Sequence, residues 1–372
     1  MPYTAATVQL LTPEGTLAEN EVAERYLPVI AALTDDQLRD FHRHMVVMRR
    51  FDIEAANLQR QGQLALWIPS IGQEAAQVGS GLATRAQDHV FPAYREHVIA
   101  RIRGVDLLKI IAMLRGLSHG GWDPAKHGNF HLYTLVIGSQ TLHATGYAMG
   151  ITLDGATATG DVDSDQAVIV YFGDGASSQG DVSEALVFAA SYQTPQVFFL
   201  QNNHWAISVP VSRQSRTPLY LRPSGFGIPG IQIDGNDVLA SYAVTRDNLD
   251  SARSGGGPRF IEALTYRMGA HTTSDDPTKY RADEDLQFWA ERDPIVRFET
   301  YLRGRGESEA FFAEIAVEGD DLASDVRRRV VELVPPVAST MFDHVYSDPH
   351  PLMDEQRAWL AAYEASFEEG AP

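Results

Sequence analysis

The 372-residue chain contains no cysteine. This absence excludes disulfide bonds, thiolate metal sites and a cysteine nucleophile, although it does not identify a cellular compartment. Basic residues are also scarce, because 30 lysines and arginines stand against 49 aspartates and glutamates, which gives a formal net charge of -19. A strongly acidic protein is poorly suited to bind the phosphate backbone of nucleic acids, so we expect no nucleic-acid partner.

Long apolar runs and a targeting segment are missing as well. No run approaches the roughly 20 apolar residues that a membrane-spanning helix needs. The N-terminal stretch MPYTAATVQLLTPEGT lacks the basic region followed by an apolar segment that is typical of a signal peptide. Apolar residues nevertheless make up 44% of the chain, which is ample for a buried core. We therefore expect a soluble, cytoplasmic protein that does not contact a membrane.

The most informative stretch of the sequence is residues 168–208, where two apolar segments each end in small polar residues. Residues 167–172 and 197–200 are continuous apolar runs, which are typical of strands buried on both faces of a parallel sheet. Between them, residues 183–192 carry apolar side chains at helical spacing. This strand–helix–strand pattern predicts a right-handed crossover, with both strands ending at the same edge of the sheet.

Asp174 and Asn203 follow these two strands, so we expect them to lie side by side at that edge, where open α/β sheets bind ligands. Carboxylate and amide oxygens are ligands that Mg²⁺ prefers, and Mg²⁺ usually adds phosphate oxygens and water. The glycines beside Asp174 allow a tight turn, and the backbone amides of residues 176–178 can face an anion. Either motif alone is compatible with an ordinary turn, but together they predict a metal–diphosphate site.

Several motifs occur in one order along the chain. The triplet GDG (residues 173–175) and the pair NN (residues 202–203), with 26 residues between them, match the thiamine diphosphate fingerprint. The others are MVVMRRFD (45–52), GQEAAQVG (72–79), FPAYREH (91–97), IGSQTLHATGYAMG (137–150) and GAHTTSDDPTKYR (269–281). With this set, residues 34–302 resemble the α subunit of the E1 component of 2-oxo acid dehydrogenase complexes.

The resemblance implies an α/β fold with a doubly wound parallel sheet of the thiamine diphosphate-binding type and helical extensions at both ends. Residues 1–33 are expected to form a loosely packed N-terminal arm, and residues 34–302 the thiamine diphosphate-binding domain. Residues 303–372 are expected to form a helical C-terminal segment packed on that domain. The residue pattern itself predicts one long amphipathic helix over residues 35–61, capped by Thr34.

The resemblance also implies a set of cofactor-binding residues. These are Tyr94, Arg95, Ile137, Asp174, Gly175, Ala176, Asn203, Trp205, Arg267 and His271. Asp174, Asn203 and the backbone carbonyl of Trp205 would bind Mg²⁺. A buried diphosphate needs further cations, and the planar guanidinium of arginine binds phosphate oxygens in pairs, which suits Arg95 and Arg267.

Without the resemblance, some of these residues would have ordinary interpretations. Tyr94 and Arg95 could belong to a surface turn, and His271 to a solvated polar loop. Ile137 matches the apolar residue under the bent cofactor in the family, but core packing explains it equally well. Two positions depart from the family pattern: Trp205 stands where tyrosine is common, which a backbone ligand tolerates, and Gln201 replaces a glutamate or arginine, which removes one charge near the diphosphate.

The implied activity is thiamine diphosphate-dependent oxidative decarboxylation of a small 2-oxo acid, with transfer of the acyl group to a lipoyl-bearing E2 acyltransferase. His271 would lie nearest the reacting carbon, as the candidate catalytic residue. No second thiamine-fold domain is visible in the sequence, so the resemblance implies an E1 β subunit, in an α2β2 heterotetramer, that supplies the activating glutamate.

The substrate and one alternative class of function stay open at this point. GIPGIQIDG (residues 227–235) resembles pyruvate enzymes and favours pyruvate, whereas the Ser-Asp-Asp of residues 274–276 resembles branched-chain enzymes, which act on 3-methyl-2-oxobutanoate. The alternative class is a non-catalytic nucleotide-phosphate binding protein, because a parallel sheet with glycine-rich strand ends serves many ligands. The sequence lacks GxxxxGK[ST], which removes the usual signature of an ATP site.

Overall fold

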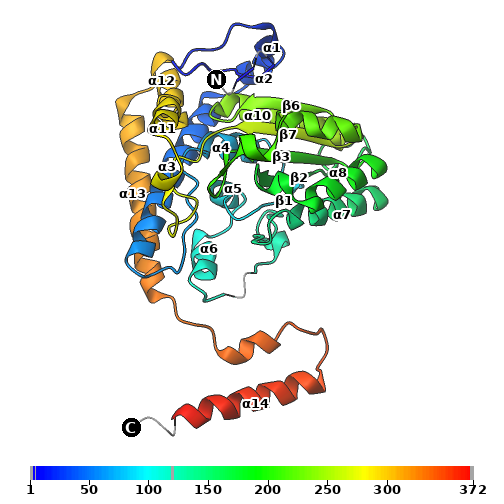
Figure 1. The fold of residues 1–372 in the computed structure, drawn as a ribbon, viewed down its shortest axis with the longest axis vertical. Coiled ribbons are helices and arrows are strands. Elements are labelled where there is room, and N and C mark those ends of the chain that lie inside the picture. Colours follow the sequence, from blue (N-terminus) through cyan, green and yellow to red (C-terminus); the bar gives the residue numbers. More distant parts are fainter. Residues whose placement is uncertain (1–2, 5, 119–120, 369–372) are drawn as a thin grey trace.

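The computed structural model describes residues 3–4, 6–118 and 121–368. Its centre is a five-stranded parallel sheet with the strand order β1-β2-β3-β7-β6 (Figure 1). The strands are β1 (His89–Phe91), β2 (Val168–Gly173), β3 (Gln196–Asn202), β6 (Gly230–Asp234) and β7 (Arg259–Leu264). Every neighbouring pair in this sheet is parallel, which confirms the predicted fold class.

Helices cover both faces of the sheet, because alternate residues of each strand point to opposite faces. On β2, Val168, Val170 and Phe172 pack with α7 (Ser139–Leu153) and α8 (Gly180–Tyr192). The intervening Ile169 and Tyr171 belong to a second core on the other face. The sheet is therefore doubly wound, and its strands are buried on both sides.

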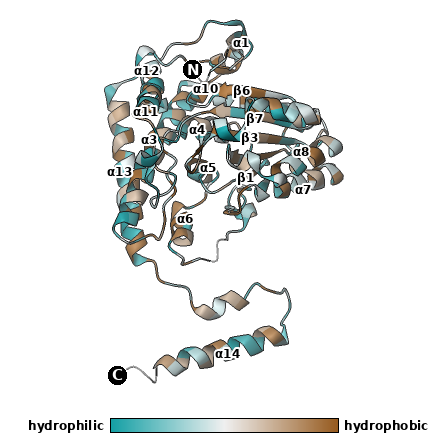
Figure 2. Cartoon of the chain, viewed as in Figure 1, coloured by the Kyte–Doolittle hydropathy of each residue, from teal (hydrophilic) through white to brown (hydrophobic). Residues whose placement is uncertain are grey.

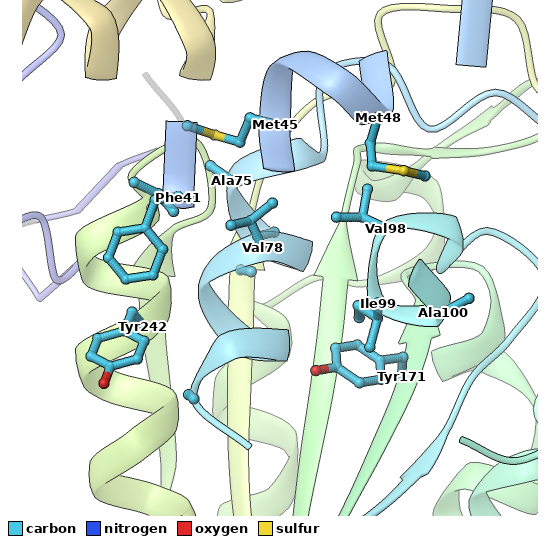
Figure 3. Packing of buried hydrophobic residues seen from close by; sticks show 14 of the residues in the cluster. Phe41, Met45, Met48, Ala75, Val78, Val98, Ile99, Ala100, Tyr171 and Tyr242 are labelled. Atoms are coloured by element: carbon cyan, nitrogen blue, oxygen red, sulfur yellow. The ribbon is translucent and has the colours of Figure 1, made fainter. Parts of the chain in front are cut away.

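Four helices that are distant in sequence contribute to the second core. They are α3 (Asp35–Arg60), α4 (Glu74–Leu82), α5 (His97–Ile102) and α10 (Val238–Arg253). Figure 3 shows Phe41 of α3 against Tyr242 of α10, whose ring centroids are 5.2 Å apart, and Ile99 of α5 over Tyr171 of the sheet. The predicted long helix is confirmed as α3, which begins after Thr34 with a capping box.

The N-terminal arm is packed more tightly than the sequence predicted. Val8 forms a parallel bridge with Ile233 of β6. The backbone N–H groups of Leu10 and Leu11 donate to Oδ2 of Asp237 at 2.6 and 2.7 Å, and both leucines are fully buried. The arm continues through α1 (Glu21–Glu24) and α2 (Leu27–Ala31). The beginning of the arm is thus part of the core beside the sheet edge rather than a loose extension.

The C-terminal segment has two parts that behave differently. After α11 (Asp283–Ala290) and α12 (Pro294–Gly304), the long helix α13 (Glu309–Glu332) packs along α3. Beyond it, the short η5 (Ala338–Phe342) and the helix α14 (Pro351–Glu368) lie away from the α/β body (Figure 1). We expected the whole segment to pack on the domain, but only α13 is seen against it.

Apolar and polar residues alternate along the ribbon of α14 (Figure 2), and several of its apolar side chains are exposed. Trp359, Tyr363 and Phe367 follow one another at helical spacing of four residues, and each is at least half exposed. Within the described residues, no helix combines the length and apolar character that would carry it across a membrane. In the part of the chain that the structure describes, α14 lies away from the α/β body, so its apolar stripe is exposed.

Candidate functional site

A cavity of about 230 Å³ lies at the carboxyl ends of β2 and β3. The adjacent strands pair Gly173 with Gln201, so the residues that follow them emerge together at this edge, as predicted. Nine of the ten predicted cofactor residues line the cavity: Tyr94, Arg95, Ile137, Asp174, Gly175, Ala176, Asn203, Trp205 and His271. The tenth, Arg267, is fully buried and bonded to His271, one of the lining residues.

Asp174 is a buried acid without a cationic partner. Its side chain accepts a hydrogen bond at Oδ2 from Nε2 of Gln214 at 2.9 Å, and no ion pair to Asp174 occurs among the residues that the structure describes. Burial raises the pKa of Asp174 to about 6, although the hydrogen bond from Gln214 opposes this effect. An unpaired buried carboxylate is unfavourable, so this position favours the binding of a cation.

The turn after β3 carries two neutral oxygens that could bind a metal, Oδ1 of Asn203 and the backbone carbonyl of Trp205. Oδ1 of Asn203 accepts from the backbone N–H of Trp205 at 3.2 Å, and His204 between them has a left-handed φ of 70° that makes the turn tight. No group of three histidine, cysteine or acidic side chains suited to a metal ion occurs in the described part of the chain. One carboxylate with amide and carbonyl oxygens is a donor set that fits Mg²⁺, which keeps water and phosphate among its ligands.

His271 lies between two guanidinium groups. Nη2 of Arg95 is 3.3 Å and Nη1 of Arg267 is 3.2 Å from its Nδ1. A guanidinium can only donate, so Nδ1 must be the acceptor and the imidazole proton is on Nε2. Burial, followed by the charges of Arg95 and Arg267, lowers the pKa of His271 to about 4. The imidazole is therefore neutral at pH 7 and offers one N–H donor.

The two arginines are held differently. Arg95 donates to the carbonyl of Pro69 and, at 3.2 Å, to the carbonyl of His271. Nη2 of Arg267 donates to the carbonyl of Ile207 and to the hydroxyl of Tyr280, both at 2.7 Å. Arg267 thus joins the turn after β3 to the loop of residues 269–281. Its Nε is buried without a hydrogen-bond partner, which leaves one donor unsatisfied behind the cavity.

The turn after Asp174 corrects one expectation. The backbone N–H groups of Ser177 and Ser178 donate to the carbonyls of Asp174 and Gly175, both at 3.2 Å, inside the short η2 (Ala176–Ser178). These two amides are therefore not available to an anion. Gly175 is required for a different reason: a Cβ there would lie 2.8 Å from the Cβ of Ala206, in the strand pair of β4 (Trp205–Ala206) and β5 (Val209–Pro210).

Sequence reasoning missed Glu96, a buried acid that also lines the cavity. Its Oε1 accepts from Nε2 of Gln201 at 2.6 Å, and burial raises its pKa. This contact gives a physical reason for Gln201, because a glutamate there would bring two carboxylates together. The position of Glu96, directly after Arg95 in the FPAYREH motif, was the only sequence signal for it.

Gln214 was also missed, and the sequence carries no signal for it. It ends the short α9 (Val211–Gln214), 40 residues after Asp174 in a polar stretch that reads as an ordinary surface loop. Only the folding of the segment after β5 over the end of β2 brings its carboxamide to Asp174. Gln201 and Gln214 are thus side-chain hydrogen-bond donors to the two acids of the site, and both are neutral.

The sequence is similar to those of several known proteins. The family described as "Dehydrogenase E1 component" matches residues 42–316. The 3-methyl-2-oxobutanoate dehydrogenase subunit alpha of Mycobacterium tuberculosis (strain ATCC 25618 / H37Rv) is 43% identical over 357 residues, which cover 95% of this chain and 93% of that protein. The pyruvate dehydrogenase E1 component subunit alpha of Acholeplasma laidlawii is 38% identical over 347 residues, covering 91% and 94%. The protein of the same description from Bacillus subtilis (strain 168) is 38% identical over 318 residues, covering 84% and 81%.

Proposed function

The chain belongs to the dehydrogenase E1 component family, and from this premise we propose that it is the α subunit of a 2-oxo acid dehydrogenase that binds the diphosphate half of thiamine diphosphate. One observation carries the proposal. The cavity is lined by a buried acid that has no ion pair among the described residues, and by a guanidinium beside a neutral histidine. Such a cavity is complementary to a divalent cation bound to a diphosphate.

The lining residues have different roles in this proposal. Asp174, the Oδ1 atom of Asn203 and the carbonyl of Trp205 would hold Mg²⁺. Arg95 would donate to phosphate oxygens, and Arg267, which contacts Nδ1 of His271, would leave the single Nε2–H of His271 free to donate. Ile137, which is partly exposed in the cavity, would contact the cofactor by apolar packing.

The bound thiamine diphosphate would supply the chemistry that removes carbon dioxide from a 2-oxo acid. The residues of this chain would hold and orient the thiamine diphosphate. Because burial and two arginines keep His271 neutral, the imidazole can donate from Nε2 without adding a further positive charge. We propose His271 as the catalytic residue of this chain, acting as a hydrogen-bond donor near the substrate.

A partner chain is part of the proposal. The relatives are described as alpha subunits, which implies an assembly of several chains. Exposed apolar side chains among the described residues include Tyr147 and Leu153 of α7, Phe188 and Tyr192 of α8, and the aromatic residues of α14. Exposed apolar side chains that gather on one surface are typical of protein interfaces. We propose that an E1 β subunit covers them in an α2β2 assembly in the cytoplasm, and that a lipoyl-bearing E2 acyltransferase accepts the acyl group.

Two substrates have support. The pyruvate-type motif at residues 227–235 favours pyruvate, and the 43% identical relative is a 3-methyl-2-oxobutanoate dehydrogenase subunit. The comparison that separates them is kcat/KM for each acid on the reconstituted α/β enzyme. Extra methylenes discriminate by about 1–3 kcal/mol in an apolar pocket, so the preferred acid should exceed the other by roughly tenfold or more.

Calorimetry tests the proposed function directly. Thiamine diphosphate with Mg²⁺ should bind the α/β enzyme, and ATP and NAD should not. Tight binding of ATP or NAD with no response to thiamine diphosphate would favour the non-catalytic nucleotide-phosphate class instead.

A further inference from the structure

Gln214 is the side chain that holds the carboxylate of Asp174 in place. Its Nε2 donates to Oδ2 of Asp174 at 2.9 Å, on the residue that the proposed function assigns to Mg²⁺. We propose that Gln214 is a positioning residue: it fixes the rotation of the Asp174 carboxylate so that the other oxygen, Oδ1, faces the metal. This inference rests on the proposed function and adds a residue that touches neither the metal nor the diphosphate.

The chemistry of the carboxamide supports this role. A glutamine is neutral, so it can orient the carboxylate without cancelling the charge that Mg²⁺ needs. A lysine or arginine at this position would form an ion pair with Asp174 and compete with the cation. The other end of the group is also held, because Oε1 of Gln214 accepts from the hydroxyl of Ser178 at 3.4 Å.

Arg222 fixes the backbone that carries Gln214. Arg222 lies in η3 (Leu219–Phe226), and its Nη2 donates to the carbonyl of Gln214 at 3.1 Å. Its Nη1 donates to the carbonyl and the hydroxyl of Ser177, both at 2.9 Å. The hydroxyl of Ser177 in turn donates to the carbonyl of Asp174 at 2.6 Å.

These contacts close a ring of hydrogen bonds through Asp174, Ser177, Arg222 and Gln214. The ring joins the turn after β2 to the segment after β5, which lies about 40 residues further along the chain. Outer-shell partners of this kind fix the geometry of a metal ligand, and their loss typically lowers metal affinity by roughly 10- to 100-fold. Arg222 is thus a second positioning residue, which acts on Asp174 through its hydrogen bonds to Gln214 and Ser177.

The test uses the α/β enzyme with Mn²⁺ as a paramagnetic substitute for Mg²⁺. Free and bound Mn²⁺ are quantified by electron paramagnetic resonance in the presence of thiamine diphosphate, for the unaltered protein and for Gln214→Ala and Gln214→Asn. The asparagine variant keeps the carboxamide but is one methylene too short to reach Asp174. Gln287→Ala, on the exposed face of α11, is the matched control.

We expect both Gln214 variants to lose Mn²⁺ affinity by roughly tenfold or more, with an altered Mn²⁺ spectrum. At saturating Mn²⁺ their affinity for thiamine diphosphate should equal that of the unaltered protein, and the control should change neither quantity. Arg222→Leu should weaken Mn²⁺ binding in the same direction.

The melting temperature of each variant, measured in parallel, separates positioning from folding. Unchanged Mn²⁺ affinity and spectrum in folded Gln214→Ala would overturn the positioning role. Asparagine behaving like glutamine would also contradict it, because the role depends on reach. Failure of the unaltered α/β enzyme to bind Mn²⁺ with thiamine diphosphate would instead overturn the proposed function itself.

Discussion

Arg267 donates from Nη1 to Nδ1 of His271 across 3.2 Å, and this contact places the imidazole proton on Nε2. Because a guanidinium can only donate hydrogen bonds, Nδ1 must be unprotonated, and the neutral imidazole carries its proton on Nε2. Nη2 of Arg95 also donates to Nδ1 of His271, at 3.3 Å. A diphosphate bound in the cavity would add negative charge next to this cluster of cations.

The first prediction concerns the pKa of His271. Without ligand its pKa is about 4, below the ordinary value of 6.5, so the neutral form stabilises the fold above pH 6.5 and this contribution is lost as the pH falls towards 4. Thiamine diphosphate with Mg²⁺ should raise the pKa, because the anion stabilises the protonated ring. Histidine NMR titrations with and without the cofactor, assigned with His271→Gln, measure both values. A ligand-free pKa near 6.5 would contradict the burial and charge argument.

The second prediction is that Asp174→Asn makes the metal-free chain more stable but abolishes Mg²⁺-dependent binding of thiamine diphosphate. Burial raises the folded-state pKa of Asp174 to about 6 from 3.8, so its ionisation opposes folding of the metal-free chain as the pH rises through this window. The variant should therefore stabilise the metal-free chain at pH 7.5, by roughly 3 kcal/mol.

The same variant should lose Mg²⁺-dependent binding of thiamine diphosphate, because no negative ligand remains. Urea unfolding without metal and calorimetry with Mg²⁺ test the two halves. A variant that binds the cofactor as tightly as the unaltered protein would remove Asp174 from the set of ligands.

The third prediction uses the contact between Gln201 and Glu96. Gln201→Glu places a second carboxylate against Oε1 of Glu96, where Gln201 now donates at 2.6 Å. Loss of this buried donor should destabilise the chain by about 1–3 kcal/mol at pH 7.5. The exchange variant, Gln201→Glu with Glu96→Gln, restores one acid and one amide and should recover most of that loss. If the exchange variant is no more stable than Gln201→Glu, the two side chains are not coupled.

The fourth prediction concerns α14. Among the described residues, its aromatic stripe is exposed and the helix lies away from the α/β body, so a chain ending after Leu333 should unfold at the same temperature as the full chain. The truncated chain should fail to assemble with the β subunit, or do so only weakly, because the exposed stripe is proposed to bind that partner. Light scattering of the mixed subunits measures the assembly. Normal assembly of the truncated chain would show that α14 serves another purpose.

The sequence predicted the part of the molecule that depends on local pattern. The apolar runs of β2 and β3 and the helical spacing of α8 are local, and the crossover rule then brings Asp174 and Asn203 to one edge. The cap at Thr34 is local as well, and the structure confirms it.

The remaining features depend on contacts between distant side chains. The burial of Leu10 and Leu11 depends on Asp237, more than 200 residues away, and a short polar segment gives no sign of such a partner. The contact of Gln214 with Asp174 is of the same kind. The position of α14 could not be predicted either, because an amphipathic pattern indicates a helix with one apolar face but not the surface that covers it.

The central claim is that this chain holds only half of an active site. The most direct measurement compares turnover of a 2-oxo acid by the chain alone and with the β subunit, in the presence of thiamine diphosphate, Mg²⁺ and an artificial electron acceptor. Because misplacing a catalytic group by about 1 Å can lower the rate a hundredfold, a missing group should leave the chain alone almost inactive. The account predicts turnover only in the mixture, and a lone chain within about tenfold of the mixture would contradict it.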